Sequence, residues 1–182
     1  MKNILAIGGS NSKKSINTVF ATHIAQRITN ANVTTANWDE LVLPLYSPDL
    51  EEEMGIPQNA TNFKKQIEDA DAIVISLAEY NGLPSSAFKN LWDWTSRIDQ
   101  KIWLDKPMFL AAASPGGRGG INALTVTKNL MPHFGGNVLE DFSFPSFYQN
   151  FQEGKVVNEE LDKVLASKIQ NFQNALQAYT NP

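Results

Sequence analysis

The sequence contains no cysteine, and this absence excludes several kinds of chemistry at once. Without thiols there is no disulfide framework, no redox-active cysteine pair, no thiolate nucleophile and no zinc site built on thiolates. The chain has 182 residues, of which 42% are hydrophobic and 19% are charged. A chain of this size and composition can bury a core without a disulfide or metal. We therefore expect a single domain over residues 1–182.

Long apolar runs are missing as well. The run near the N-terminus, residues 4–7, is too short for the apolar part of a signal peptide. No later stretch approaches the roughly 18 consecutive apolar residues of a membrane span. The sequence therefore predicts a cytoplasmic protein that does not associate with membranes.

The first 38 residues contain no carboxylate, because the first acidic residue of the chain is Asp39. The same segment carries four bases, Lys2, Lys13, Lys14 and Arg27, although the formal net charge of the whole chain is −4. Four bases are too few for a nucleic-acid-binding face, so we expect no nucleic-acid partner. A small anionic ligand near the N-terminus fits this charge distribution better.

Short apolar runs alternate with amphipathic stretches along the chain. The runs predict five buried strands, at residues 4–7, 33–38, 71–77, 107–113 and 138–142. Helical spacing and capping residues predict helices from Ser15 to about 28, over 60–70, from Pro84, over 119–133 and over 159–179. Residues 39–59 contain three prolines and the acidic run 51–53, and they predict a long loop.

This alternation predicts an α/β fold with right-handed β-α-β units and a parallel sheet covered by helices on both faces. Five strands in this rhythm fit the flavodoxin-like order 2-1-3-4-5, a three-layer sandwich. Its ligand site lies outside the carboxyl ends of the strands. Glycines follow the first, third and fourth predicted strands, whose ends are neighbours in this order.

The loop between the first strand and the first helix, residues 8–17, has a composition that suits phosphate. Two glycines allow close approach of the backbone, and the helix start offers free N–H groups and the positive end of its dipole. An ordinary capped helix after a tight turn is the alternative. A P-loop is disfavoured because Lys13 stands where the second glycine of G-x-x-x-x-G-K-[ST] belongs.

A family resemblance appears in the second loop, where residues 78–94 read AEYNGLPSSAFKNLWDW. This stretch resembles the P-E-Y-N-G-x-x-P-x-x-L-K-N-x-x-D-W signature of the NADPH-dependent FMN reductases, flavodoxin-like enzymes that reduce quinones, azo dyes and chromate. Residues 8–17 resemble the G-S-x-R-x-x-S-x-N motif of the family, and residues 114–120 resemble its glycine-rich stretch. Two positions depart from the pattern, since Ser12 replaces the usual arginine and Ala78 replaces a proline.

The resemblance implies FMN as the cofactor and NADPH or NADH as the co-substrate, with hydride transfer at flavin N5 and no catalytic side chain. It places the FMN phosphate in the first loop and the ring against the second and third loops. The implied cofactor-binding residues are Ser10, Ser12, Ser15, Ile16, Asn17, Glu79, Tyr80, Asn81, Gly82, Ser114, Gly116 and Gly117. Losing the arginine removes a charge-assisted phosphate contact and predicts a dissociable FMN, unless Lys13 or Lys14 compensates. Arg118 is either a ligand of the NADPH 2′-phosphate, an interface residue or a solvated side chain.

These observations predict an NAD(P)H-dependent FMN oxidoreductase that reduces a small-molecule acceptor, namely a quinone, an azo compound or free flavin, by a ping-pong mechanism. The alternatives are a flavodoxin-like FMN-binding electron carrier or regulator that does not react with NADPH, and a descendant that has lost flavin. We expect no metal site, and we expect His23 and His133 to have packing or surface roles.

A homodimer or homotetramer is also expected. The resemblance implies it, and the helix that starts near Pro84 carries large apolar side chains around more than one side: Phe88, Leu91, Trp92 and Trp94. Trp92 is expected in the core, since it shares a helical stripe with Phe88 and Leu91.

Overall fold

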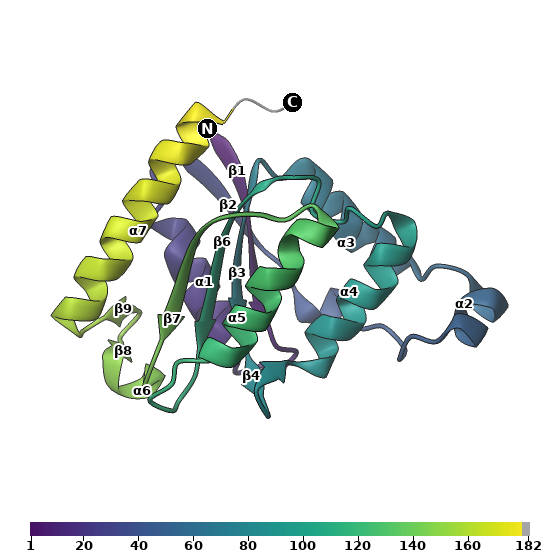
Figure 1. Cartoon of the computed structure of the whole chain (residues 1–182), viewed down its shortest axis with the longest axis horizontal. Coiled ribbons are helices and arrows are strands. Elements are labelled where there is room, and N and C mark those ends of the chain that lie inside the picture. The colour runs from purple at the N-terminus through teal and green to yellow at the C-terminus, as the bar shows by residue number, and fades with distance from the viewer. Residues whose placement is uncertain (180–182) are drawn as a thin grey trace.

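The computed structural model describes residues 1–179, which are built around a five-stranded parallel sheet (Figure 1). The sheet order is β2-β1-β3-β6-β7, and every neighbouring pair is parallel. Counted along the chain this is the order 2-1-3-4-5, which confirms the predicted flavodoxin-like winding. The strands are β1 (Lys2–Gly9), β2 (Ala31–Thr35), β3 (Ala72–Leu77), β6 (Pro107–Ala113) and β7 (Asn137–Phe144).

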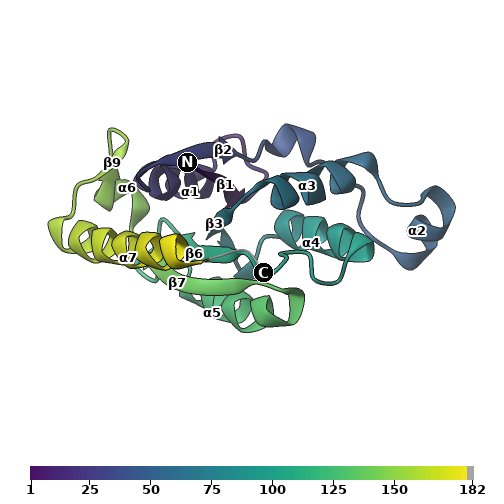
Figure 2. The ribbon, with the colours of Figure 1, turned by 90° about the horizontal axis from the view of Figure 1, so that it is seen from above.

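Helices cover both faces of the sheet, as Figure 2 shows from above. One face packs against α1 (Ile16–Gln26) and α7 (Glu159–Ala178). The other packs against α3 (Gln58–Asp69), α4 (Ser86–Ile98) and α5 (Ile121–Leu130). Successive strand residues supply the two cores in turn, because side chains alternate across a strand. In β1, Ile4 and Ala6 belong to the first core, and Leu5 and Ile7 belong to the second.

The segment after β2 differs from the sequence prediction. β2 ends at Thr35 rather than at Trp38, and Trp38–Glu40 form a short 3-10 helix capped by the Asn37 side chain. Residues 39–59 are also not one long loop, because they contain the helix α2 (Pro48–Met54). That prediction was wrong because Ser47 caps this helix, Pro48 occupies its first turn, and two acidic residues there favour its dipole.

Other helix boundaries shift by a few residues. α4 starts at Ser86 rather than at Pro84, since Ser85 is its cap and Pro84 belongs to a two-residue strand. α5 ends at Leu130, and a 3-10 helix, Met131–Phe134, continues from it. Three short elements after β7 were not predicted: α6 (Phe147–Asn150), β8 (Phe151–Gln152) and β9 (Lys155–Val156).

The large apolar side chains of α4 are buried within the chain. Phe88, Leu91 and Trp92 pack in the core beneath the sheet, as predicted for Trp92. Trp94 on another side is 0% exposed, stacks edge-on against Tyr46 and donates a hydrogen bond to the carbonyl of Pro44 at 2.7 Å. These apolar side chains therefore lie on more than one side of α4, as expected, but they leave little apolar surface exposed, because the segment before α2 covers the outer side.

Candidate functional site

The carboxyl ends of β1, β3 and β6 open into one hollow of about 220 Å³, which we call the strand-end crevice. The carboxyl ends of these strands lie at the lower edge of the sheet in Figure 1. Three loops far apart in the sequence meet there, as the strand order requires. Eight of the twelve residues expected to bind the cofactor line it: Ser10, Ser12, Ser15, Ile16, Asn17, Glu79, Tyr80 and Ser114. The other lining residues are Lys14, Ala78, Ala113, Pro115 and Tyr148.

The first loop presents hydroxyl groups to the crevice. Ser10 is only 3% exposed, and its Oγ lies 3.5 Å from the Tyr80 hydroxyl and accepts a hydrogen bond from the N–H of Ser12. Ser15 caps α1, its Oγ accepting a hydrogen bond from the N–H of Thr18 at 3.1 Å. Because Ser15 accepts in this contact, its hydroxyl hydrogen stays available as a donor, and that of Ser10 does so when Tyr80 donates to Ser10. Together with Lys14 and the start of α1, which has no carboxylate in its first turn, this donor set fits a phosphate group.

Contacts from two other segments hold this loop in place. The carbonyl of Gly8 accepts a hydrogen bond from the indole Nε1 of Trp38 at 2.6 Å. The carbonyl of Gly9 accepts one from the buried hydroxyl of Ser85, the cap of α4, at 2.7 Å. A Cβ atom on Gly8 would lie 2.3 Å from Oγ1 of Thr18, so only glycine allows β1 to approach α1 this closely.

Asn17 lines the crevice, but its side chain is mostly engaged inside the protein. Its Oδ1 accepts hydrogen bonds from the hydroxyl of Ser76 at 2.7 Å and from the N–H of Ala113 at 3.0 Å. Its Nδ2 donates to the carbonyl of Ala113 at 3.1 Å. One amide side chain therefore ties α1 to the ends of β3 and β6, and one N–H of this amide stays available to a ligand.

The second loop is a tight hairpin. Its strands are β4 (Glu79–Tyr80) and β5 (Leu83–Pro84), and Asn81 and Gly82 form the two-residue turn with φ values of 52° and 81°. Positive φ at both positions is typical of a type I′ turn, for which Asn-Gly is the preferred pair. The turn projects Tyr80, which is 56% exposed, at the mouth of the crevice.

Glu79 points toward α5 rather than toward the open part of the crevice. Its Oε2 accepts hydrogen bonds from the N–H groups of Asn122 and Ala123, at 2.9 and 3.0 Å. α5 has no acidic residue in its first turn and no side-chain cap from within the helix. Glu79, which lies in a loop distant in sequence, accepts the hydrogen bonds of N–H groups that would otherwise be unpaired at the start of this helix. This contact fixes the second loop against the third.

The third loop contributes less to the crevice than expected. Ser114 and Pro115 line it, whereas Gly116 and Gly117 are exposed, with open space where a Cβ would stand. Arg118 donates a hydrogen bond to Oδ1 of Asn122 at 2.9 Å and is exposed.

Tyr148 is a crevice residue that the sequence did not reveal. It is 62% exposed and comes from α6, after the last strand of the sheet. No motif marks it, and a resemblance centred on the three loops has no reason to include it.

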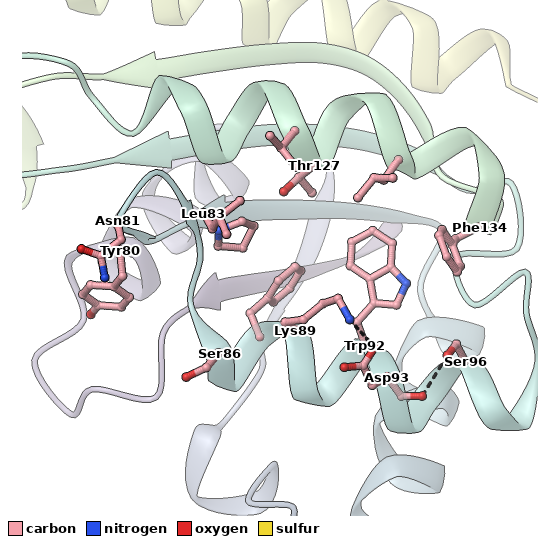
Figure 3. A pocket seen from close by; sticks show the side chains of 14 residues that line it. Tyr80, Asn81, Leu83, Ser86, Lys89, Trp92, Asp93, Ser96, Thr127 and Phe134 are labelled. Carbon is pink, nitrogen blue, oxygen red and sulfur yellow. Dashed lines mark hydrogen bonds and ion pairs between the residues drawn. The ribbon is translucent and has the colours of Figure 1, made fainter. Parts of the chain in front are cut away.

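A larger hollow of about 840 Å³, the α4–α5 groove, adjoins the second loop (Figure 3). Its walls come from the hairpin, α4 and α5, and they are mainly apolar: Leu83, Pro84, Phe88, Trp92, Val126, Leu130 and Phe134. Tyr80 lines both hollows, and Asn81 lines the groove. Two buried polar atoms of the groove, Nε1 of Trp92 and Oγ1 of Thr127, have no hydrogen-bond partner among the described residues.

The two histidines lie away from the crevice lining. His23 packs against Phe20 and, edge-on, against Phe151 with ring centroids 5.0 Å apart. Burial, with a smaller contribution from the nearby Arg27, lowers the pKa of His23 below its usual value. His133 is exposed in the 3-10 helix after α5. Residues 1–179 contain no cluster of three or more metal-type side chains and no helix long and apolar enough to cross a membrane.

The chain is similar in sequence to known oxidoreductases. The family described as NADPH-dependent FMN reductase matches residues 2–149. The quinone reductase of Escherichia coli K12 is 29% identical over 130 residues, which are 64% of this chain and 64% of that enzyme. A 2-hydroxy-1,4-benzoquinone reductase of a Burkholderia species is 30% identical over 137 residues, 71% of this chain and 72% of that enzyme.

The fold is also shared with a solved structure. The flavoenzyme NAD(P)H:acceptor oxidoreductase FerB of Paracoccus denitrificans matches with a TM-score of 0.80 and 24% sequence identity, over 98% of each chain. At this identity the likeness shows the fold alone. The similarity covers 64% of the length of the Escherichia coli quinone reductase, less than two thirds of it.

Proposed function

This chain belongs to the NADPH-dependent FMN reductase family, and we propose that it is an NAD(P)H-dependent FMN oxidoreductase of the cytoplasm. FMN and NAD(P)H, expected from the sequence, are the cofactor and electron donor of this family. The observation that carries the proposal is the strand-end crevice. There, hydrogen-bond donors suited to a phosphate and an exposed aromatic ring meet at the ends of three neighbouring strands. Relatives named quinone reductases support a quinone as the acceptor. Azo compounds and free flavin are further acceptors that we propose from the sequence.

The residues of the first loop would hold the FMN phosphate. The hydroxyls of Ser10, Ser12 and Ser15 and the N–H groups at the start of α1 supply hydrogen bonds, and Lys14 supplies positive charge. Ile16 and the remaining N–H of Asn17 complete the wall of this part of the crevice. Because no arginine stands at position 12, we propose that FMN is a dissociable cofactor.

The ring of FMN would lie between the second and third loops. Tyr80 offers an aromatic wall, and the backbone at Asn81 and Gly82 offers polar groups on one side. Ser114 and the backbone of Gly116 and Gly117 offer them on the other side. Glu79 acts indirectly, by fixing the second loop to α5.

Bound FMN supplies the hydride-transfer chemistry at its N5 atom, which makes a ping-pong exchange between NAD(P)H and the acceptor possible. The chain therefore needs no catalytic acid or base, and its residues bind, orient and exclude water. The placement of His23 against Phe151 and the exposure of His133 fit this division of roles.

We also propose a homodimer, or a homotetramer built from it, with the α4–α5 groove facing a second copy. The groove exposes the apolar side chains of Leu83, Val126 and Leu130 to water, which is unfavourable. Contiguous apolar surface of this kind marks interaction sites. The unpartnered Nε1 of Trp92 and Oγ1 of Thr127 beneath it also favour a covered groove.

The experiment that tests the proposed function measures NADPH and NADH oxidation by the protein with FMN and benzoquinone. We expect acceptor-dependent oxidation, and its loss in Ser12→Asp, which places a negative charge beside the phosphate donors. Ser167→Asp, an exposed position on α7, is the charge-matched control and stays active. If the protein binds FMN but oxidises no nicotinamide with any quinone or dye, the enzyme proposal fails and the electron-carrier alternative takes its place.

A further inference from the structure

A second hollow lies on the β2 side of the first loop, and we call it the lysine pocket. Its volume is about 580 Å³, and its walls come from the first loop, the start of α1, the segment after β2, and α6. Five residues line both this pocket and the strand-end crevice: Ser12, Lys14, Ser15, Ile16 and Tyr148. The lysine pocket therefore continues the crevice beyond the hydroxyl groups of the first loop. It lies away from Tyr80, which lines only the crevice of these two hollows.

The two lysines of this pocket form no ion pair within residues 1–179. Of the four bases in residues 1–38, Lys2 pairs with Asp71 and Arg27 pairs with Asp162. Lys13 and Lys14 are exposed and make no ion pair within residues 1–179. Two adjacent lysines against the single carboxylate of Asp39 leave the wall of the hollow with an excess of positive charge, which favours an anionic group there.

The opposite wall presents aromatic rings and one carboxylate. Trp38 is held by the hydrogen bond from its Nε1 to the carbonyl of Gly8, so its ring is fixed at the wall. Tyr148 is largely exposed at the junction of the two hollows. Fixed or exposed aromatic faces suit a planar base, and the carboxylate of Asp39 can accept hydrogen bonds from sugar hydroxyls.

Phosphate, sugar and base together describe a nucleotide, and a pocket of this volume falls within the range of about 300–1,000 Å³ typical of small-molecule sites. We propose that the lysine pocket binds the adenosine-phosphate end of a dinucleotide, with its phosphate on Lys13 and Lys14 and its sugar near Asp39. The inference rests on the proposed function and deepens it, since it assigns a place to the far end of NADPH. The adenylate half of FAD has the same chemistry, so the test separates the two sources.

Lys13 is the residue that tests the pocket by itself. It lines the lysine pocket but not the strand-end crevice, whereas Lys14 lines both. We would titrate the protein with 2′,5′-ADP and with 5′-AMP by calorimetry, with and without saturating FMN. The wild type should bind 2′,5′-ADP saturably, and Lys13→Gln should weaken this binding about five- to tenfold by removing one charge-assisted contact.

The same variant should bind FMN with an affinity within about twofold of the wild-type value, because the hydrogen-bond donors of the crevice are unchanged. Lys65→Gln on α3, which removes a charge from an exposed lysine outside both hollows, is the control and should change neither affinity. The inference is overturned if neither probe binds saturably, or if Lys13→Gln binds 2′,5′-ADP as the wild type does. Failure of FMN to bind in the same titrations would instead contradict the proposed function.

The source of the adenosine follows from two comparisons. If 2′,5′-ADP competes with NADPH and FAD binds no tighter than FMN, the pocket serves the co-substrate. If FAD binds at least tenfold tighter than FMN and Lys13→Gln removes this advantage, the pocket serves the adenylate half of the cofactor. Either result supports the adenosine-phosphate site.

Discussion

The carboxylate of Glu79 lies 2.9 Å from the backbone nitrogen of Asn122, and through this contact the loop after β3 caps α5. The family resemblance implies that Glu79 borders the flavin ring. In the structure Glu79 lines the crevice, and its carboxylate accepts hydrogen bonds from two N–H groups at the start of α5. The crevice therefore depends on a side chain that stabilises the relative position of two loops. Tyr80 follows Glu79 directly, so its place at the crevice mouth depends on the same contact.

Glu79→Ala should lower the free energy of unfolding by about 1–2 kcal/mol, because two N–H groups of α5 lose their acceptor and the helix dipole loses a negative charge. Urea unfolding followed by circular dichroism measures this loss. Glu53→Ala, at an exposed position of α2, is the matched control. Equal stabilities of the two variants would show that the cap contributes nothing.

Asn17→Ala should cost about 2–4 kcal/mol of stability, since it leaves the Ser76 hydroxyl and both backbone groups of Ala113 unpaired in the interior. Asn11→Ala, in the exposed part of the same loop, should change stability little. Denaturant unfolding of both variants without FMN makes the comparison. If Asn17→Ala is as stable as Asn11→Ala, the amide does not tie the three elements together.

The sequence alone predicted the sheet order and most strands, because each buried strand is a short apolar run with glycine or a polar loop at its end. It did not predict the end of β2, since Trp38 continues the apolar pattern. In the structure its indole turns to the carbonyl of Gly8 instead. Contacts of this kind join residues far apart in the chain, and no local pattern reports them.

In the candidate site, too, the local sequence predicts some features, and long-range contacts determine the others. The composition of the first loop predicts hydroxyl donors, and Ser10, Ser12 and Ser15 line the crevice because they are close in sequence and follow one strand. The engagement of Asn17 and Glu79 with other elements, and the arrival of Tyr148 from α6, depend on long-range packing. The sequence therefore predicted where the crevice lies. It did not distinguish residues whose side chains are open to the crevice from residues whose side chains hold its loops in place.

The pH dependence of stability should contain a contribution from His23. Burial lowers the pKa of this imidazole in the folded protein, so the unfolded chain takes up the proton first as the pH falls. The stabilising contribution is complete above about pH 6.5, the usual value, and is lost progressively below it. His23→Phe should therefore lose less stability than the wild type between about pH 7 and about pH 5.5.

His133→Gln is the matched control for this experiment, because His133 is exposed. It should follow the wild type over the same range in urea unfolding. A His23→Phe variant whose stability falls as steeply as that of the wild type would contradict the assignment of this titration to His23.

Leu130→Asp should convert the proposed oligomer to a monomer, because it places a charge in the apolar α4–α5 groove. Light scattering after size exclusion measures the mass of both proteins at micromolar concentration. Val164→Asp, at a similarly exposed apolar position of α7, is the control and should keep the wild-type mass. A monomeric wild type would contradict the oligomer, and an oligomeric Leu130→Asp would contradict its location.

Whether the strand-end crevice binds FMN can be measured with an FMN titration followed by flavin fluorescence. We predict saturable binding by the wild type. In Ser12→Arg we predict about tenfold tighter binding, because the guanidinium adds a charge-assisted contact beside the phosphate donors. Ser167→Arg on α7 should bind as the wild type does. Absence of saturable binding in both the wild type and Ser12→Arg would show that the strand-end crevice does not bind FMN.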